Sequence, residues 1–230
     1  LTFNDVDTVV QMKVGISFVS EQKARQNCMD DCNGWTFDGV REGLVNQWEQ
    51  LLHKMKISDD EPLRSKRMFY TALYHTMLMP TDRTGDNPLW IGDAPYYDDF
   101  YAIWDTYRTS LPLITLIDQE REVGIVRSLI DIYRRDGYMP DARSGNCNGR
   151  TQGGSNAEIV IADARAKGLE GIDYEMGLKA MLNDATVPPG GNQEAEGRGG
   201  LAEYLSLGYI PYGIPRAGNR TVEYAFCDWA

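Results

Sequence analysis

Residues 96–116 hold four charged side chains within a segment rich in aromatic rings. The charged residues are Asp98, Asp99, Asp105 and Arg108. A core segment rarely accepts charges at this density unless they pair with each other or face a cleft. Two interpretations follow. This is either a buried helix start, with Asp105 as a cap and aspartate–arginine pairs, or a site for a sugar or another polar ligand.

A helix is expected to begin inside this stretch. The apolar residues recur at helical spacing, at Ile103, Tyr107, Leu111 and Ile114. On such a helix Trp104 and Arg108 lie four residues apart on one face, and Asp105 stands beside that face in the first turn. The helix therefore gathers an aromatic ring, a carboxylate and a guanidinium in one place.

The second candidate for chemistry is a loop at residues 137–155. It contains five glycines and many amide or hydroxyl side chains. A loop of this length inside a domain is usually functional or disordered, and its tyrosine, proline and arginine residues favour an ordered one. Ser155 or Asn156 is expected to cap the next helix, at residues 157–167.

Composition and charge limit the classes of partner. The chain has 230 residues, enough for one or two domains, and its net charge of −11 disfavours nucleic acid and anionic membranes as partners. No apolar run approaches the roughly 20 residues that span a bilayer. Leu1 is not an initiator and no signal peptide is visible, so we interpret the sequence as an internal fragment.

The sequence offers little for zinc or nucleophile chemistry. His53 and His75 are the only imidazoles, which disfavours a histidine-rich zinc site, and no Gly-x-Ser-x-Gly motif marks a serine nucleophile. Cys28 and Cys32 lie one helical turn apart. That spacing favours ordinary thiols or a local disulfide over metal ligation.

The order of the expected elements indicates helix-on-helix packing. Alternating apolar residues predict a half-buried strand at residues 8–19. The later helical segments are residues 20–32, 37–57, 63–79, 103–117, 119–136, 157–167, 173–185, 199–207 and 220–230. Almost no strand is expected after residue 20, so the fold class is mainly α.

The segment Trp-Asp-Thr-Tyr-Arg at residues 104–108, followed by Pro-Leu at 112–113, resembles the signature of glycoside hydrolase family 92. This family comprises calcium-dependent, exo-acting α-mannosidases. Other segments resemble the family in the right order, at residues 14–20, 69–76, 194–198, 207–211, 221–225 and 228–229. The resemblance therefore spans essentially the whole chain.

The resemblance implies a fold and a division of the chain. The fold would be the first half of an (α/α)6 barrel, preceded by the last strand of a β-sandwich domain and a linker helix. Residues 1–20 would end the β-sandwich domain, residues 21–62 would form linker helices, and residues 63–230 would form the N-terminal half of the catalytic domain. Residues 80–102 would form a small hairpin near the active-site mouth.

The resemblance also implies roles for single residues. Asp105 would contact the sugar hydroxyls and Trp104 would pack on an apolar sugar face, with Arg108 and Asn148 as further substrate-binding residues. Alternatively, Asp105 only pairs with Arg108. The catalytic base and most ligands of a calcium cofactor are expected beyond residue 230, so no metal ligand is assigned within this chain.

The sequence departs from the family in the loop that should carry the general acid. Residues 144–157 contain no carboxyl group, where many members have a glutamate. Gln152 is expected at the acid position, with Asn148 as its rival. Glu158 is a candidate substitute acid, expected to face solvent or a loop arginine such as Arg143.

The missing carboxyl group bears on the substrate. An amide cannot deliver a proton, and general acid catalysis typically contributes about 10²–10⁴-fold to the rate. A phosphate leaving group needs no proton to depart near neutral pH, whereas a sugar alkoxide does. The sequence therefore favours a mannosyl phosphodiester over other mannose-containing glycans, with Arg143 and Arg150 as candidate phosphate partners. The alternatives are an inactive carbohydrate-binding relative, an ordinary α-1,2-mannosidase that uses another acid, and a helical scaffold without a sugar site.

The sequon Asn219-Arg220-Thr221, together with the family's usual export, favours a secreted, extracellular glycoprotein.

The proposed sugar contacts also predict an arrangement in the fold. If one sugar touches both Asp105 and Gln152, these two residues must lie at the same end of the helical array.

Overall fold

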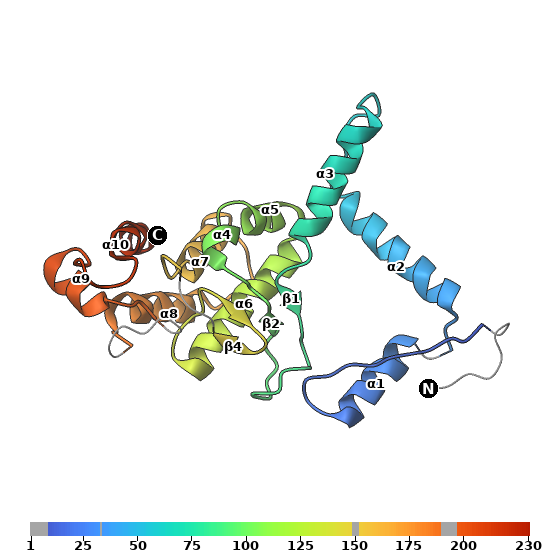
Figure 1. Cartoon of the computed structure of the whole chain (residues 1–230), viewed down its shortest axis with the longest axis horizontal. Coiled ribbons are helices and arrows are strands. Elements are labelled where there is room, and N and C mark those ends of the chain that lie inside the picture. The colour runs from blue at the N-terminus through green and yellow to red at the C-terminus, as the bar shows by residue number, and fades with distance from the viewer. Residues whose placement is uncertain (1–8, 33, 149–151, 190–196) are drawn as a thin grey trace. The chain divides into compact units, whose positions relative to one another are not determined.

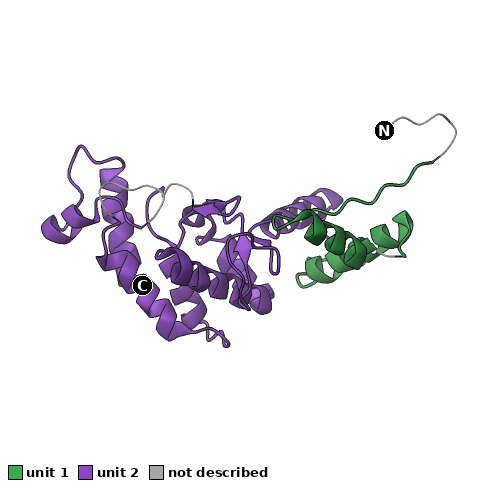
Figure 2. Cartoon of the chain, turned by 90° about the horizontal axis from the view of Figure 1, so that it is seen from below, with its two compact units in different colours: residues 1–59 green, residues 60–230 purple. Residues whose placement is uncertain are grey.

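The structure is a computed structural model that describes residues 9–32, 34–148, 152–189 and 197–230. The chain divides into two compact units, residues 1–59 and residues 60–230 (Figure 2). Helices predominate in the described residues, and strand is limited to two short antiparallel pairs. The prediction of a mainly α fold is confirmed. The boundaries of the three predicted domains stay a prediction.

The first unit contains two helices, α1 (Glu21–Cys32) and α2 (Phe37–Leu52). Ser20 Oγ accepts from the Lys23 amide at the start of α1, and Thr36 Oγ1 accepts from the Gly39 amide at the start of α2. Both hydroxyl groups thus satisfy backbone donors that the first helical turn leaves free. The second helix ends at Leu52 rather than at residue 57, because the chain continues in turns bonded three residues back.

The strand predicted at residues 8–19 is not confirmed. Residues 9–19 run as irregular coil, and their alternating apolar side chains are exposed, as at Met12 and Ile16. Alternation predicts a strand only where a neighbouring strand supplies backbone partners and a covered face. Within the described residues, no strand pairs with this segment.

The second unit consists mainly of helices (Figure 1). Their bounds are α3 (Leu63–Thr76), α4 (Ile103–Thr106), α5 (Ser110–Ile117), α6 (Gln119–Asp136), α7 (Ala157–Ala166), α8 (Tyr174–Thr186), α9 (Leu201–Leu207) and α10 (Ala217–Trp229). The long helix α6 packs against α5, α7 and α8, and fully buried residues such as Ile125, Leu129 and Ile132 line its inner face. Their spacing of three and four residues is that of one helical stripe.

The helix predicted at residues 103–117 is interrupted between α4 and α5. Pro112 explains the break, because it has no amide hydrogen for the Arg108 carbonyl and its ring would crowd that carbonyl. Restarting at Ser110 places Pro112 in the first turn of α5, where an amide hydrogen is not needed. The break leaves α4 as a single turn that carries Trp104 and Asp105.

Two hairpins shape the loops of this unit. Strand β1 (Thr81–Asp82) pairs with β2 (Tyr97–Asp98), which places a hairpin within residues 80–102 as expected. Strand β3 (Arg143–Ser144) pairs with β4 (Cys147–Asn148) inside the glycine-rich loop, which is ordered where the structure describes it.

The structure bears on the expected state of the cysteines and on the length of the helices. All four cysteines are free, so the local Cys28–Cys32 disulfide does not form. Among the helices that the structure describes, none combines the length and apolarity needed to cross a membrane.

Candidate functional site

The single turn of α4 presents Asp105 at the surface. Its side chain is exposed and has no hydrogen-bond or ion-pair partner among the described residues. The N-cap of α4 is Ala102, which offers no side-chain cap. Asp105 is therefore neither a helix cap nor the partner of Arg108. The first interpretation, a buried helix start capped by Asp105, is wrong for this carboxylate.

Arg108 is held beside Trp104 by four contacts. Its guanidinium lies 5.0 Å from the centre of the Trp104 ring and 4.7 Å from that of Tyr107. Arg108 Nη2 forms an ion pair with Glu223 Oε1 of α10 at 2.9 Å, and Arg108 Nε donates to the Trp104 carbonyl. Helix α10 thus buttresses the indole ring that is the candidate sugar platform.

The loop segment of Gln152 lies against the same indole ring. A Cβ atom at Gly153 would stand 3.0 Å from Trp104 Nε1 and 2.6 Å from Asn219 Nδ2 of α10, so a side chain there would push both groups aside. Glycine therefore allows this close approach. Gln152 itself is exposed and directly precedes Gly153. The structure brings Trp104, Asp105 and Gln152 to one end of the unit, while their roles remain predictions.

Sequence reasoning missed the residue that joins these parts, which is Asp141. Its carboxylate is buried. It accepts hydrogen bonds from the backbone amide of Gln152 and from the side-chain Nδ2 of Asn156, both at 3.0 Å. Its own carbonyl accepts from the Ile103 amide at 2.7 Å. Burial raises the pKa of Asp141 to about 6, although these hydrogen bonds act in the opposite direction. Asn156 occupies the N-cap of α7, as predicted, but its amide serves Asp141 instead of the helix.

Two other aspartates in the aromatic segment form a structural network. Arg83 donates to Asp98 Oδ2 and to Asp99 Oδ2, each at 2.7 Å. The Asn146 amide donates to the same Asp98 oxygen, which ties the two hairpins together. The charged residues of the segment 96–116 therefore fall into two groups. Asp98 and Asp99 hold the hairpins together, whereas the Asp105 side chain is exposed.

Asn148 belongs to this network rather than to the surface around Trp104. Its Oδ1 accepts from Arg143 Nη1 at 2.6 Å. Arg143 is buried and also pairs with Asp136 and Asp98. The prediction of Arg143 as a phosphate partner is therefore wrong, because its guanidinium is enclosed by carboxylates. Arg150, the other candidate, lies outside the described residues.

The prediction that Glu158 faces solvent or a loop arginine is also wrong. Its side chain is buried, accepts from Ser155 Oγ at 2.6 Å and pairs with Arg198 Nη2 at 3.3 Å. Burial raises the pKa of Glu158 to about 7, and Arg198 limits that rise. A carboxyl group in this position is not accessible to a substrate at the described surface.

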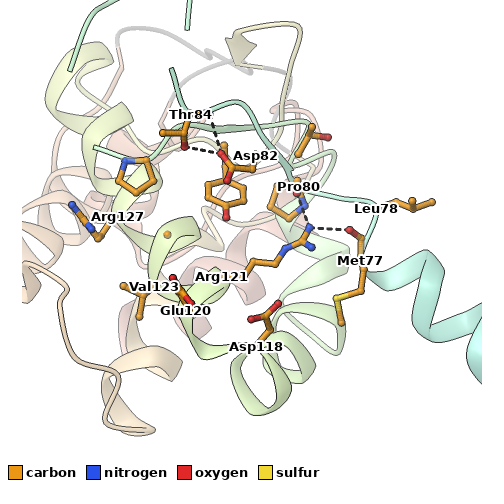
Figure 3. Close-up of a pocket in the computed structure, with 14 residues that line it drawn as sticks. Met77, Leu78, Pro80, Asp82, Thr84, Asp118, Glu120, Arg121, Val123 and Arg127 are labelled. Atoms are coloured by element: carbon orange, nitrogen blue, oxygen red, sulfur yellow. Dashed lines mark hydrogen bonds between the residues drawn. The ribbon is translucent and has the colours of Figure 1, made fainter. Parts of the chain in front are cut away.

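A pocket of about 680 Å³ opens elsewhere in the unit, between the end of α3 and the start of α6 (Figure 3). Arg121 reaches from α6 to the carbonyls of Met77 and Pro80 on one side of it, and Asp82 and Thr84 lie on the other (Figure 3). Its lining includes neither Trp104 nor Gln152. Size alone therefore does not identify the site, which rests on the chemistry around Trp104.

The described residues do not make a calcium site by themselves. Within them, no group of three or more histidine, cysteine, aspartate or glutamate side chains is arranged to hold a metal ion. Calcium prefers six to eight oxygen ligands, and Asp105 is a single exposed carboxylate.

Comparisons with known proteins place the chain. A secreted glycosidase of Arthroderma benhamiae, described as uncharacterized, is 35% identical over 96% of this chain and 27% of its own length. A family 92 inverting mannosidase of Bacteroides thetaiotaomicron superposes with a TM-score of 0.81 at 29% identity, over 93% of this chain and 30% of that one. A second family 92 α-mannosidase of that organism, in complex with mannoimidazole, gives 0.76 at 28% identity, over 93% and 28%.

These structures confirm the prediction that the helices form part of an (α/α) barrel. The chain spans less than a third of the length of each of these three relatives. The model of the glycosyl hydrolase family 92 catalytic domain matches residues 23–230. The chain therefore belongs to glycosyl hydrolase family 92 and forms part of its catalytic domain.

Proposed function

We propose that the whole protein carrying this chain is an exo-acting α-mannosidase that hydrolyses terminal α-mannosyl linkages with inversion at the anomeric carbon. The observation that carries the proposal is that the loop segment containing Gln152 and Gly153 lies against Trp104, the chain neighbour of Asp105 on α4. Membership of the family and the likeness to two mannosidase structures support the substrate class.

Trp104 and Asp105 supply the grip on the sugar in this proposal. The exposed Asp105 carboxylate can accept hydrogen bonds from two neighbouring hydroxyl groups of a hexose. The apolar ring of Trp104, fixed by Arg108 and Gly153, can pack against the C–H face of the same sugar.

The substrate that fits the acid position best is a mannose-1-phosphodiester. Gln152 can donate a hydrogen bond to the leaving oxygen but has no proton to transfer. Arg143 is enclosed, yet Arg216 at the start of α10 is exposed and donates to the Gln152 carbonyl. We assign to Arg216 the charge attraction for the phosphate that the sequence suggested for the loop arginines.

The proposal includes three features of the whole protein. Calcium would assist by binding and distorting the mannose, with most ligands outside these residues. The partner would be a mannosyl phosphodiester or another mannose-containing glycan. Location would be extracellular, since the Arthroderma relative is named a secreted glycosidase. A binding-only relative is the second candidate, because residues 144–157 lack a carboxyl group.

The test is the release of mannose by the purified whole protein. We expect proton NMR to show β-mannose as the first anomer formed from an α-mannosyl substrate, since attack by water on the opposite face inverts the centre. Chelation of calcium should slow this release. First formation of α-mannose, or binding of mannosides without any release, would contradict the proposal.

A further inference from the structure

Asp141 stands out because it is a buried carboxylate with no cation beside it among the described residues. Asp141 is 2% exposed, and both of its carboxylate oxygens accept from neutral donors, which are the backbone amide of Gln152 and Asn156 Nδ2. Buried charges in proteins are usually paired, so an exception held by amides alone is costly to fold. Such a residue is a candidate for a role in function.

The contacts of Asp141 form a closed ring around the candidate site. Its backbone carbonyl accepts a hydrogen bond at 2.7 Å from the backbone amide of Ile103, the residue before Trp104. Its carboxylate holds the Gln152 amide at 3.0 Å, one residue before Gly153. Gly153 in turn lies against the Trp104 indole, which closes the ring. One residue therefore holds both the turn that carries Trp104 and the loop that carries Gln152.

We propose that Asp141 is a positioning residue that holds Gln152 in place relative to Trp104 and Asp105. This inference rests on the proposed function for its effect on turnover, but its effect on the loop does not. A carboxylate suits the task because two donors, from the loop and from α7, aim at its two oxygens. Asparagine has one acceptor oxygen, so Asp141→Asn must either leave one donor unsatisfied or turn the Asn156 amide around.

The test compares Asp141→Asn and Asp141→Ala with wild type in the whole protein. Asp141→Ala removes both acceptors. We expect kcat on a mannosyl substrate to fall about 10²-fold, because misplacement of a group by about 1 Å has an effect of that size. The rise in KM should be smaller than this fall in kcat. Asp141→Asn should lie between Asp141→Ala and wild type. Hydrogen exchange at the Gln152 amide should become at least tenfold faster in both variants.

The matched control is Glu122→Gln, another buried carboxyl group of this unit, located on α6 and without contact to the loop. It should leave kcat and exchange at Gln152 unchanged. If the folded Asp141 variants keep wild-type kcat, or if their exchange rises evenly over the unit as in a merely structural defect, the inference is overturned. Faster exchange confined to the loop in a protein that releases no mannose would support the positioning and defeat the proposed function instead.

The pH profile gives an independent readout. Burial raises the pKa of Asp141 to about 6, and Glu223 on α10 raises it further. Tyr224 and Cys227 face it from the same helix, and burial raises the pKa of both, so they stay neutral near pH 6. Protonation below about pH 6 removes one acceptor, so wild-type kcat should fall there. Asp141→Asn should lack that limb, and its retention in the variant would contradict the inference.

Discussion

Replacing Gln152 with glutamate is expected to raise the rate on α-1,2-mannobiose by about 10²–10⁴-fold, the usual contribution of a general acid. The variant supplies a proton to a sugar alkoxide that cannot leave easily without one. Activity on a mannose-1-phosphodiester should stay equal or fall, because a carboxylate near the phosphate repels it and no proton is needed. The measurement is kcat/KM on both substrates with calcium present.

The matched control for this prediction is Asn148→Asp, which places a carboxyl group at the rival position. Asn148 accepts from the buried Arg143, so a new carboxylate there would pair with that guanidinium and stay ionised. We expect no gain on the disaccharide. A gain from Asn148→Asp without one from Gln152→Glu would move the acid position to residue 148.

Replacing Arg198 with methionine is expected to destabilise the domain by about 3–5 kcal/mol, the usual effect of breaking a buried ion pair. Arg198 is 1% exposed and holds Glu158, Ser155 and Asp228. Without it, Glu158 would be a buried carboxylate that also faces Asp184. The measurement is the unfolding midpoint of wild type and variant. Arg134→Met, which breaks an exposed pair with Asp173, is the control and should change stability by less than about 1 kcal/mol.

The destabilisation should depend on pH in a defined direction. The pKa of Glu158 is raised to about 7 in the folded protein, and burial raises that of Asp184 well above its usual value. The folded state therefore binds more protons than the unfolded state above about pH 4.5, and stability falls as pH rises toward 7. Loss of Arg198 raises both pKa values further. The deficit of Arg198→Met should thus be larger at pH 8 than at pH 5, and a deficit independent of pH would contradict the assignment.

Local signals in the sequence were sufficient for most helices and for part of the site. Ser20, Asn156 and Asp173 mark helix starts by their type, and the structure places helices after each of them. The motif around Trp104 and Asp105 was visible because its residues are adjacent in the chain. The break between α4 and α5 could also be inferred from Pro112, although the helical spacing of the apolar residues concealed it.

Contacts between distant residues could not be predicted in the same way. Glu158 meets Arg198 across 40 residues, and Asp141 meets Gln152 across 11, through backbone geometry that no periodicity reveals. Asn148 was expected at the site because the family resemblance made it the rival of Gln152, and only the position of Arg143 shows that its side chain is engaged. The strand at residues 8–19 failed because a strand needs a partner strand.

The most direct test of the central claim compares wild-type rates on two substrates under one condition. The whole protein is assayed with calcium on a mannose-1-phosphodiester and on unactivated α-1,2-mannobiose, at equal concentrations below KM. The absence of a carboxyl group between Ser144 and Ala157 predicts a kcat/KM at least about 10²-fold higher on the phosphodiester. Equal or faster hydrolysis of the mannobiose would contradict it, and would mean that a residue outside this loop supplies the proton.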